Sequence, residues 1–123
     1  MYRLTREQAL EITLDRAEGI WRRFNRLYPE LYRFEMPKIE FNGRYTVTAG
    51  VNFPKLNIIE LGYKFYARNM PNMLTVILPH EIAHQVDYNL HGKCEVKHGH
   101  GKNWRAIMLA YGLDPERFHD MRV

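Results

Sequence analysis

The sequence predicts an α+β fold in which a small antiparallel three-stranded sheet packs on an N-terminal helix and on a second helix that carries a metal-site pattern. Three observations predict it. Apolar residues recur with a helical period over the first 28 residues, a two-residue alternation follows between residues 37 and 61, and a second helical stretch covers residues 71–90. Three short strands cannot bury both faces of a sheet, so we expect the first helix to cover one face.

The N-terminal segment is predicted to form one long amphipathic helix. Thr5 and Gln8 have the spacing of a capping box, in which each side chain bonds a backbone N–H left free at the helix start. The apolar stripe consists of Leu10, Leu14, Ala17, Trp21, Phe24 and Tyr28. Four arginines lie off that stripe among acidic residues: Arg16, Arg22, Arg23 and Arg26. This mixture of charges favours a solvated face over a nucleic-acid surface, and Pro29 is expected to end the helix.

The sheet is predicted from three segments with a two-residue period. The first covers residues 37–42 and ends in an Asn-Gly pair, a turn signal typical of hairpins. The second covers residues 45–53, and the third follows a turn at Pro54 and covers residues 56–61. Gly50 interrupts the second strand, which indicates a bulge or a close approach of the backbone to a neighbour.

Two further helices are predicted in the second half of the chain. In the first of them, residues 71–90, Pro79 predicts either a kink or a new helix that starts with proline in its first turn. A loop rich in glycine and histidine follows over residues 91–101. The last helix is expected over residues 102–111 and should end at Gly112.

The composition is that of an ordinary globular domain. The 123 residues are 46% hydrophobic and 26% charged, with no apolar run long enough to cross a bilayer. The N-terminus lacks the apolar core of a signal peptide, and the single cysteine, Cys94, cannot form an internal disulfide. We therefore expect a cytoplasmic or nucleoid-associated protein with no membrane partner. The net charge of +4 agrees in sign with a polyanionic partner but carries little weight alone.

The pattern His-Glu-x-x-His at residues 80–84 predicts a zinc site with one Zn²⁺ per chain. His80 and His84 stand about 6 Å apart along a helix and about 40° apart around it, so both imidazoles can bind one ion. Glu81 lies about 100° round from His80, beside the ion rather than bound to it, where it can take a proton from the attacking water. The alternative reading, two buried structural histidines, is disfavoured.

A catalytic zinc site also needs a third protein ligand and one open position. Three known arrangements do not fit this chain. The metzincin pattern requires glycine and histidine where the chain has Asp87 and Leu90, and the thermolysin-like arrangement requires a glutamate that the 102–111 helix lacks. A deformylase cysteine would precede the histidine pair. His91 lies roughly 10 Å along the axis from His84, too far to join the site.

Among the loop histidines, His100 is favoured as the third ligand. Glycines on both sides of it allow a sharp backbone turn, so that its side chain can fold back over the helix. The alternatives are His98, Asp87 and Cys94. Asp87 lies on the ligand face, where we expect it to orient an imidazole rather than to bind the ion.

Two segments together resemble the SprT-like family of zinc peptidases, whose member Spartan degrades proteins crosslinked to DNA. They are residues 78–85, Leu-Pro-His-Glu-Ile-Ala-His-Gln, and residues 99–104, Gly-His-Gly-Lys-Asn-Trp. The resemblance covers most of residues 37–119. It implies a compact zincin-like fold, and we expect residues 1–123 to form a single domain of this kind without the C-terminal zinc ribbon of bacterial members.

The resemblance also implies roles for individual residues. The zinc ligands would be His80, His84 and His100. Glu81 would be the general base, and Trp104 would pack the last helix near the site. The candidates for supporting the ligands are Asp87, His98 and His119. The candidates for donating to the oxyanion are Tyr63, Tyr66 and His119, although packing roles are favoured for each.

The implied function is that of a zinc-dependent metalloendopeptidase with a protein or peptide substrate, acting on DNA-associated or DNA-crosslinked proteins in DNA repair. Substrates of such enzymes lie extended along a sheet edge, so we expect one of the two strands between Tyr45 and Leu61 to be that edge. Lysines around the metal loop are expected to bind DNA weakly and without sequence preference: Lys93, Lys97 and Lys102.

Two other functions are compatible with the same residues. A nucleic-acid-associated module would hold a structural zinc, with Cys94 or His98 closing its fourth position, and would lack hydrolytic activity. A zinc hydrolase acting on a non-peptide amide would need a small-molecule pocket, for which the sequence has no motif. The sequence does not define an oligomeric state.

Overall fold

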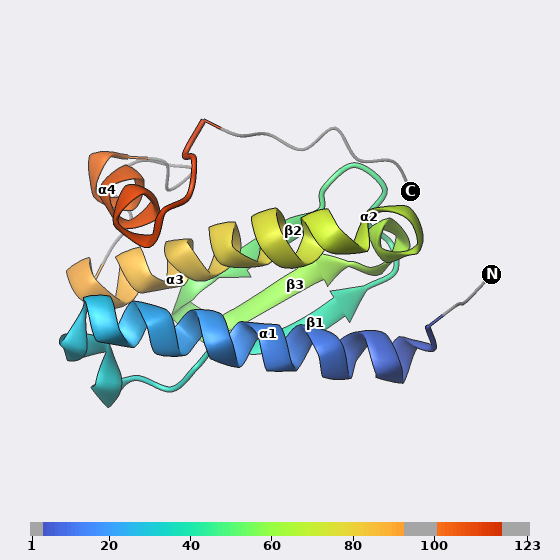
Figure 1. Ribbon diagram of the computed structural model, residues 1–123, viewed down its shortest axis with the longest axis horizontal. Helices are drawn as coiled ribbons and strands as arrows, with labels where there is room; N and C mark the ends of the chain where they lie inside the picture. Colours follow the sequence, from blue (N-terminus) through green and yellow to red (C-terminus); the bar gives the residue numbers. More distant parts are fainter. Residues whose placement is uncertain (1–3, 93–100, 117–123) are drawn as a thin grey trace.

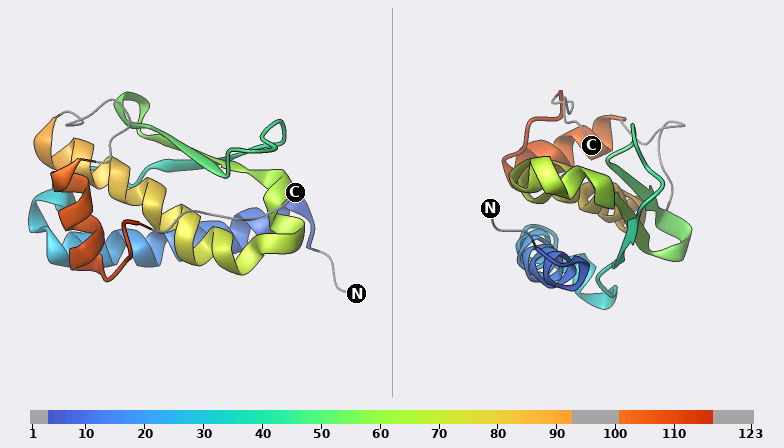
Figure 2. Two further views of the ribbon diagram at one scale, coloured as in Figure 1. Left: turned by 90° about the horizontal axis from the view of Figure 1, so that it is seen from above. Right: turned by 90° about the vertical axis from the view of Figure 1, so that its right-hand side faces the viewer.

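The computed structural model describes residues 4–92 and 101–116. Over these residues the α+β prediction is confirmed: a three-stranded sheet lies against helices α1 (Arg6–Leu27) and α3 (Leu78–His91), which run side by side on one of its faces (Figures 1 and 2). Helix α4 (Lys102–Tyr111) packs at the end of the molecule where α3 finishes (Figure 1). The central position of α3 is what allows it to carry a site.

The sheet is mixed rather than antiparallel. Its order is β1 (Lys38–Asn42), β3 (Ile58–Gly62) and β2 (Gly50–Phe53), with β1 parallel and β2 antiparallel to the central strand β3. The prediction of three antiparallel strands is therefore wrong for one pair. Of the two strands proposed as the substrate edge, β2 is an edge strand and β3 is not.

The cause of this error is the connection between β1 and β2. The side chain of Asn42 accepts a hydrogen bond from the backbone N–H of Arg44 at 2.8 Å, an Asx turn that directs the chain away from a hairpin. Tyr45 then donates its hydroxyl hydrogen to Glu60 on β3 at 2.6 Å. This side-chain bond ties the connecting segment to the central strand as it passes from β1 to β2 on the other side of β3. Only the last four residues of the predicted 45–53 strand pair as β2.

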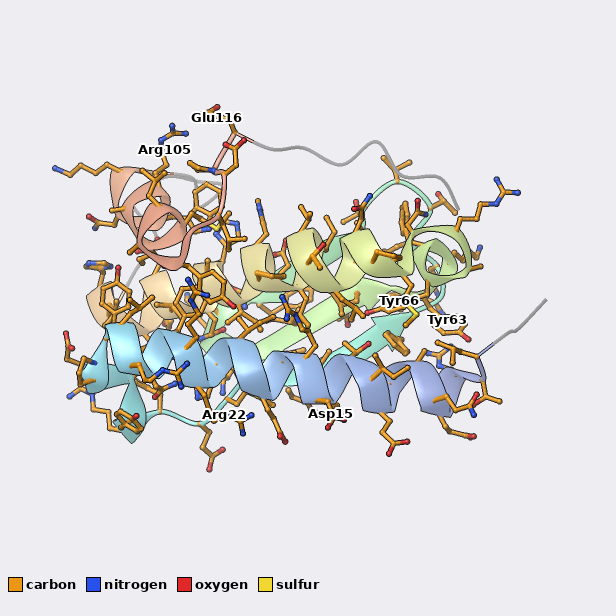
Figure 3. All side chains as sticks on the ribbon, in the orientation of Figure 1. Asp15, Arg22, Tyr63, Tyr66, Arg105 and Glu116 are labelled. Atoms are coloured by element: carbon orange, nitrogen blue, oxygen red, sulfur yellow. The ribbon has the colours of Figure 1, made fainter. Side chains whose placement is uncertain are left out.

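Helix α1 begins as predicted. The backbone N–H of Thr5 donates to Gln8 Oε1 at 2.9 Å, and the backbone N–H of Gln8 donates to Thr5 Oγ1 at 3.1 Å. Asp15 and Arg22 point outward from its solvated face (Figure 3). Arg23, although exposed, donates to the backbone oxygen of Tyr111. Its Cζ atom lies 4.4 Å from the centre of the Tyr111 ring. The arginine thereby ties α1 to the end of α4.

The predicted 71–90 helix is the later part of one helical run. It starts with α2 (Tyr66–Asn72), which is kinked at the non-helical Asn69, continues through a π-helical turn (Met73–Ile77) and becomes α3. Pro79 lies in the first turn of α3, one of the two placements that the sequence allows.

The π-turn leaves one backbone oxygen without its helical donor. The N–H of Leu78 bonds to Met73, and Pro79 has no N–H to offer to Leu74. Arg16 on α1 donates to that Leu74 oxygen at 3.3 Å. This bond fastens α1 to the helical run just before the His-Glu-x-x-His segment.

Helix α3 is buried on nearly all sides. Within residues 77–87 only His80 is not classed as buried. The described helices include none long and apolar enough to cross a membrane. The core residues contributed by other segments include Phe24, Leu31, Ile59, Leu61, Phe65 and Trp104.

Candidate metal centre

Two imidazoles project from consecutive turns at the start of α3. The Nε2 atoms of His80 and His84 lie 3.2 Å apart, with the rings at 73° to one another. Two nitrogens bound at about 2.05 Å to one tetrahedral zinc would stand about 3.3 Å apart. The pair is therefore spaced for a shared metal ion, as the four-residue interval predicts.

Glu81 completes the group. Its Oε2 atom lies 3.8 Å from His80 Nε2, and one ligand atom from each of the three residues lies within 4.8 Å of the others. Burial raises the pKa of this carboxyl to about 8, and the hydrogen bond from the backbone N–H of Asn52 opposes the shift. A buried carboxylate beside two imidazoles is a group that a cation would stabilise in its charged form.

The edge strand β2 passes directly over this carboxylate. A Cβ atom at Gly50 would lie 2.9 Å from Ile77 Cγ2 and 3.0 Å from Glu81 Cγ. The sequence prediction that Gly50 marks a close approach is confirmed, and the neighbour is α3. Any larger residue would move either the strand or the carboxylate.

Trp104 holds both imidazoles from the α4 side. Its ring stacks on His84 with centroids 4.9 Å apart and an interplanar angle of 12°, and it meets His80 edge-on at 4.9 Å. The indole is 1% exposed. The residue is thus part of the core and also restricts the orientation of both candidate ligands, which agrees with its implied place near the site.

Asp87 pairs with the imidazole of His91, which is not one of the candidate ligands. Its Oδ1 atom pairs with His91 Nδ1 at 2.8 Å, while the carboxylate itself is almost fully buried. His91 lies one turn further along α3, at the end of the helix. In the described part of the chain, Asp87 therefore orients the histidine that follows the candidate ligands.

Several predicted site residues lie outside the described residues. They are Lys93, Cys94, Lys97, His98, His100 and His119. The third ligand and the two loop lysines thus stay predictions. Lys102 is described: it is exposed at the first position of α4, two residues before Trp104.

The two tyrosines considered as oxyanion donors pack at the end of the molecule where α1 begins (Figure 3). The hydroxyl of Tyr66 shares a hydrogen bond with Thr13 Oγ1 at 3.1 Å, and its ring meets Phe41 at 4.9 Å. The ring of Tyr63 lies beneath the guanidinium of Arg6, whose Cζ atom is 4.8 Å from the ring centre. These contacts give both tyrosines the packing roles that the sequence favours.

Sequence reasoning missed two residues beside the centre, Asn52 and Gln85. The side-chain amide of Asn52 donates to Gln85 Oε1 at 2.8 Å, which joins β2 to α3. Gln85 is 1% exposed, in the middle of a buried helix. A polar side chain in such a position has to be bonded, and that was the signal available in the sequence.

Fold and site together define an α+β protein with a potential metal centre, in which a His-Glu-x-x-His helix lies beneath the edge of a small mixed sheet. The chain belongs to the SprT-like family, whose profile matches residues 17–119.

Relatives named Protein SprT support this assignment. The chain is 33% identical over 91 residues to the Vibrio parahaemolyticus protein, covering 73% of this chain and 53% of that protein. It is 30% identical over 118 residues to a Pseudomonas putida protein, covering 95% of this chain and 65% of that protein. The chain thus spans about half to two thirds of the length of the relatives it matches. No solved structure matches it significantly.

Proposed function

We propose that this chain is a zinc-dependent metalloendopeptidase that hydrolyses peptide bonds in extended polypeptides. The observation that carries the proposal is the spacing of 3.2 Å between the Nε2 atoms of His80 and His84, with Glu81 beside them beneath a sheet edge. Zinc bound by the two histidines, with His100 as the proposed third ligand, would supply a Lewis acid that polarises the scissile carbonyl and acidifies water.

Glu81 is the proposed general base. Its carboxylate would accept a proton from the attacking water and return it to the leaving amine. The hydrogen bond from the backbone of Asn52 restricts the position of this carboxylate. Glu81 directly follows His80 on α3, with its Oε2 3.8 Å from His80 Nε2, so it would hold the proton beside the proposed ligands.

The edge of β2 that faces away from β3 is the proposed substrate platform. The backbone N–H of Gly62 donates to the oxygen of Ala49 at 2.8 Å, so this pair faces inward across the sheet. Backbone groups alternate along an antiparallel strand, and those of Gly50 and Asn52 therefore point away from β3. The Asn52 N–H is bonded to Glu81, so the groups offered to a peptide are those of Gly50 and the Asn52 carbonyl. A peptide added there would lie directly above Glu81. Only an extended segment can pair in this way, which selects unfolded or loop regions.

The exposure of the site favours catalysis over a purely structural zinc. The side chain of the candidate ligand His80 retains 20% of its accessibility. A closed structural site would shield its ligands and leave no place for water.

The test is a protease assay on reduced, unfolded casein with added zinc. Glu81→Gln should retain zinc and lower turnover by about 10²–10⁴-fold, the usual effect of losing a general base. His91→Gln, a change on the same helix outside the proposed catalytic group, is the matched control. Equal activity in wild type and Glu81→Gln would refute the mechanism.

We also propose that DNA-associated proteins are the substrates, in keeping with the family resemblance. Three or four lysine contacts would give a log–log salt slope of roughly −2 to −3 on single strands, hence weak binding. Lys93→Glu with Lys97→Glu should weaken binding more than Arg22→Glu with Arg26→Glu. Arg23 is unsuitable as a control because it binds the end of α4. Absence of binding at low salt would indicate recruitment by another protein.

A further inference from the structure

A network of side-chain amides joins α3 to β2 beside the candidate metal centre. Gln85 directly follows His84 and is 1% exposed. Its Oε1 atom accepts from Asn52 Nδ2 at 2.8 Å, and its Nε2 atom donates to the backbone oxygen of Pro54 at 3.1 Å and to Asn89 Oδ1 at 2.9 Å. The amide thus binds the strand, the turn after it and its own helix.

Asn52 connects this network to Glu81. Its side-chain nitrogen also donates to the backbone oxygen of Ile58 on β3 at 3.3 Å. Its backbone N–H donates to the Glu81 carboxylate. One residue is therefore held by Gln85 through its side chain while it holds Glu81 through its backbone.

Apolar packing alone does not fix β2. Gly50, Val51 and Asn52 are only half-buried and Phe53 is exposed, so the strand has no fully buried apolar side chain of its own. Gly50 has no Cβ that could wedge the strand against α3. The height of β2 above Glu81 consequently depends on hydrogen bonds.

A glutamine at this place has a cost that its bonds must offset. Its neighbours Ile82 and Val86 are completely buried, and burying an amide among such residues is unfavourable unless its polar atoms are bonded. Leucine would fill a similar volume without that cost. We therefore attribute the presence of the amide to its bonds with Asn52 on β2 and with Pro54 in the turn after it.

We propose that Gln85 is a positioning residue that acts through Asn52 to fix the edge strand β2 above Glu81, and so sets the register in which an extended peptide binds. The inference rests on the proposed peptidase function. It assigns Gln85 no contact with substrate or metal.

Kinetics with two peptide lengths test the proposal. Gln85→Leu and Asn52→Ala should each lower kcat/KM for a ten-residue peptide about tenfold, chiefly by raising KM. Neither variant should change kcat/KM for a three-residue peptide by more than about twofold. The double variant should be no worse than the worse single variant, because both break one connection. A double variant about 100-fold below wild type would show independent effects and overturn the proposal.

Asn25→Leu is the matched control. Asn25 is also a buried amide, 4% exposed, but it donates to Trp21 within α1 and lies away from β2. This variant should lose thermal stability without a change in kcat/KM at either peptide length. Zinc content should be equal in all variants. A change in kcat/KM can then be assigned to the position of the strand rather than to loss of metal.

An NMR measurement on the zinc-free protein separates this proposal from the proposed function. The backbone amide resonance of Asn52 should shift in Glu81→Gln, which alters its acceptor, and in Gln85→Leu, but not in Asn25→Leu. A resonance that moves in Glu81→Gln and stays in place in Gln85→Leu would overturn the positioning role. If it moves in both while wild type with zinc cleaves no peptide, the peptidase proposal fails and the control of β2 by Gln85 stands.

Discussion

Glu81 on α3 and Tyr66 at the start of α2 are two buried ionisable residues, and their surroundings differ in an instructive way. Burial raises the pKa of Tyr66 to about 12, and Thr13 binds its hydroxyl. Burial raises the pKa of Glu81 to about 8, beside two imidazoles and below a sheet edge. The tyrosine stays neutral at any physiological pH, whereas the carboxyl can exchange a proton. Similar burial thus accompanies a packing element at one place and the proposed general base at the other.

Loss of a candidate zinc ligand should have the largest effect on the region around Glu81 and should leave the region around Tyr66 unchanged. His84→Ala is expected to reduce zinc from about one ion per chain to near zero after dialysis, because a single helix histidine cannot hold the ion tightly. His100→Ala should do the same. Metal analysis and far-UV circular dichroism check both. Zinc retained in His100→Ala but lost in His98→Ala would show that the third ligand is His98.

The zinc-free protein should become less stable as pH rises from about 4.5 to about 8. The pKa of Glu81 is raised from 4.5 to about 8, so its protonated form favours the folded state. This contribution is complete below pH 4.5 and lost as pH rises through 8. At about 1.4 kcal/mol per pH unit, the loss is on the order of 5 kcal/mol.

Urea unfolding of wild type and Glu81→Gln at several pH values measures this effect. The two proteins should be about equally stable below pH 4.5, and wild type should fall progressively below Glu81→Gln as pH rises through 8, since glutamine does not titrate. Added zinc should flatten the dependence because a nearby cation lowers the pKa of the carboxyl. Parallel curves for the two zinc-free proteins would contradict the role of burial.

Filling the space between β2 and α3 should damage the site more than the fold. Gly50→Ala places a methyl group 3.0 Å from Glu81 Cγ and is expected to lower kcat/KM on the order of 10²-fold, as small displacements of catalytic groups do. Gly19→Ala is the control, since a Cβ there meets nothing within 4 Å in α1. It should stabilise the protein by about 0.5–1 kcal/mol with activity unchanged.

Tyr66→Phe should have the smallest effect, and it should lower the stability of the fold rather than the activity. It removes the hydroxyl that meets Thr13, while Thr13 still donates to the backbone of Ala9 at 2.6 Å. The unfolding free energy should fall by about 1 kcal/mol. Peptidase activity should stay at the wild-type level. A large loss of activity would show that the two regions are coupled.

Local patterns predicted the helices well, because their determinants are close in sequence. The capping box at Thr5 and the helix end at Gly112 both depend on residues within one turn. The interval between His80 and His84 likewise brings two imidazoles together on any α-helix. These features follow from helical geometry, so they do not depend on what packs around them.

Sheet pairing was predicted less well, because partners lie far apart in sequence. The Asn-Gly pair after β1 predicts a hairpin, yet Asn42 bonds Arg44 and Glu60 instead, and β3 takes the place between the two earlier strands. A two-residue period shows which side chains share a face but not which strand lies beside which. The same limit hid the contact between Asn52 and Gln85.

The sequence by itself therefore determined the helical run with its two imidazoles and carboxylate, the capped first helix, and a glycine that marks a close approach. Only the tertiary structure decided that β2 is the edge above Glu81, that Trp104 packs on both imidazoles, and that Gln85 holds the strand. The physical reason is range. Hydrogen bonds within a helix act over four residues. The bond between Asn52 and Gln85, which ties the strand to the helix, joins residues 33 apart in sequence and forms only when the chain is folded.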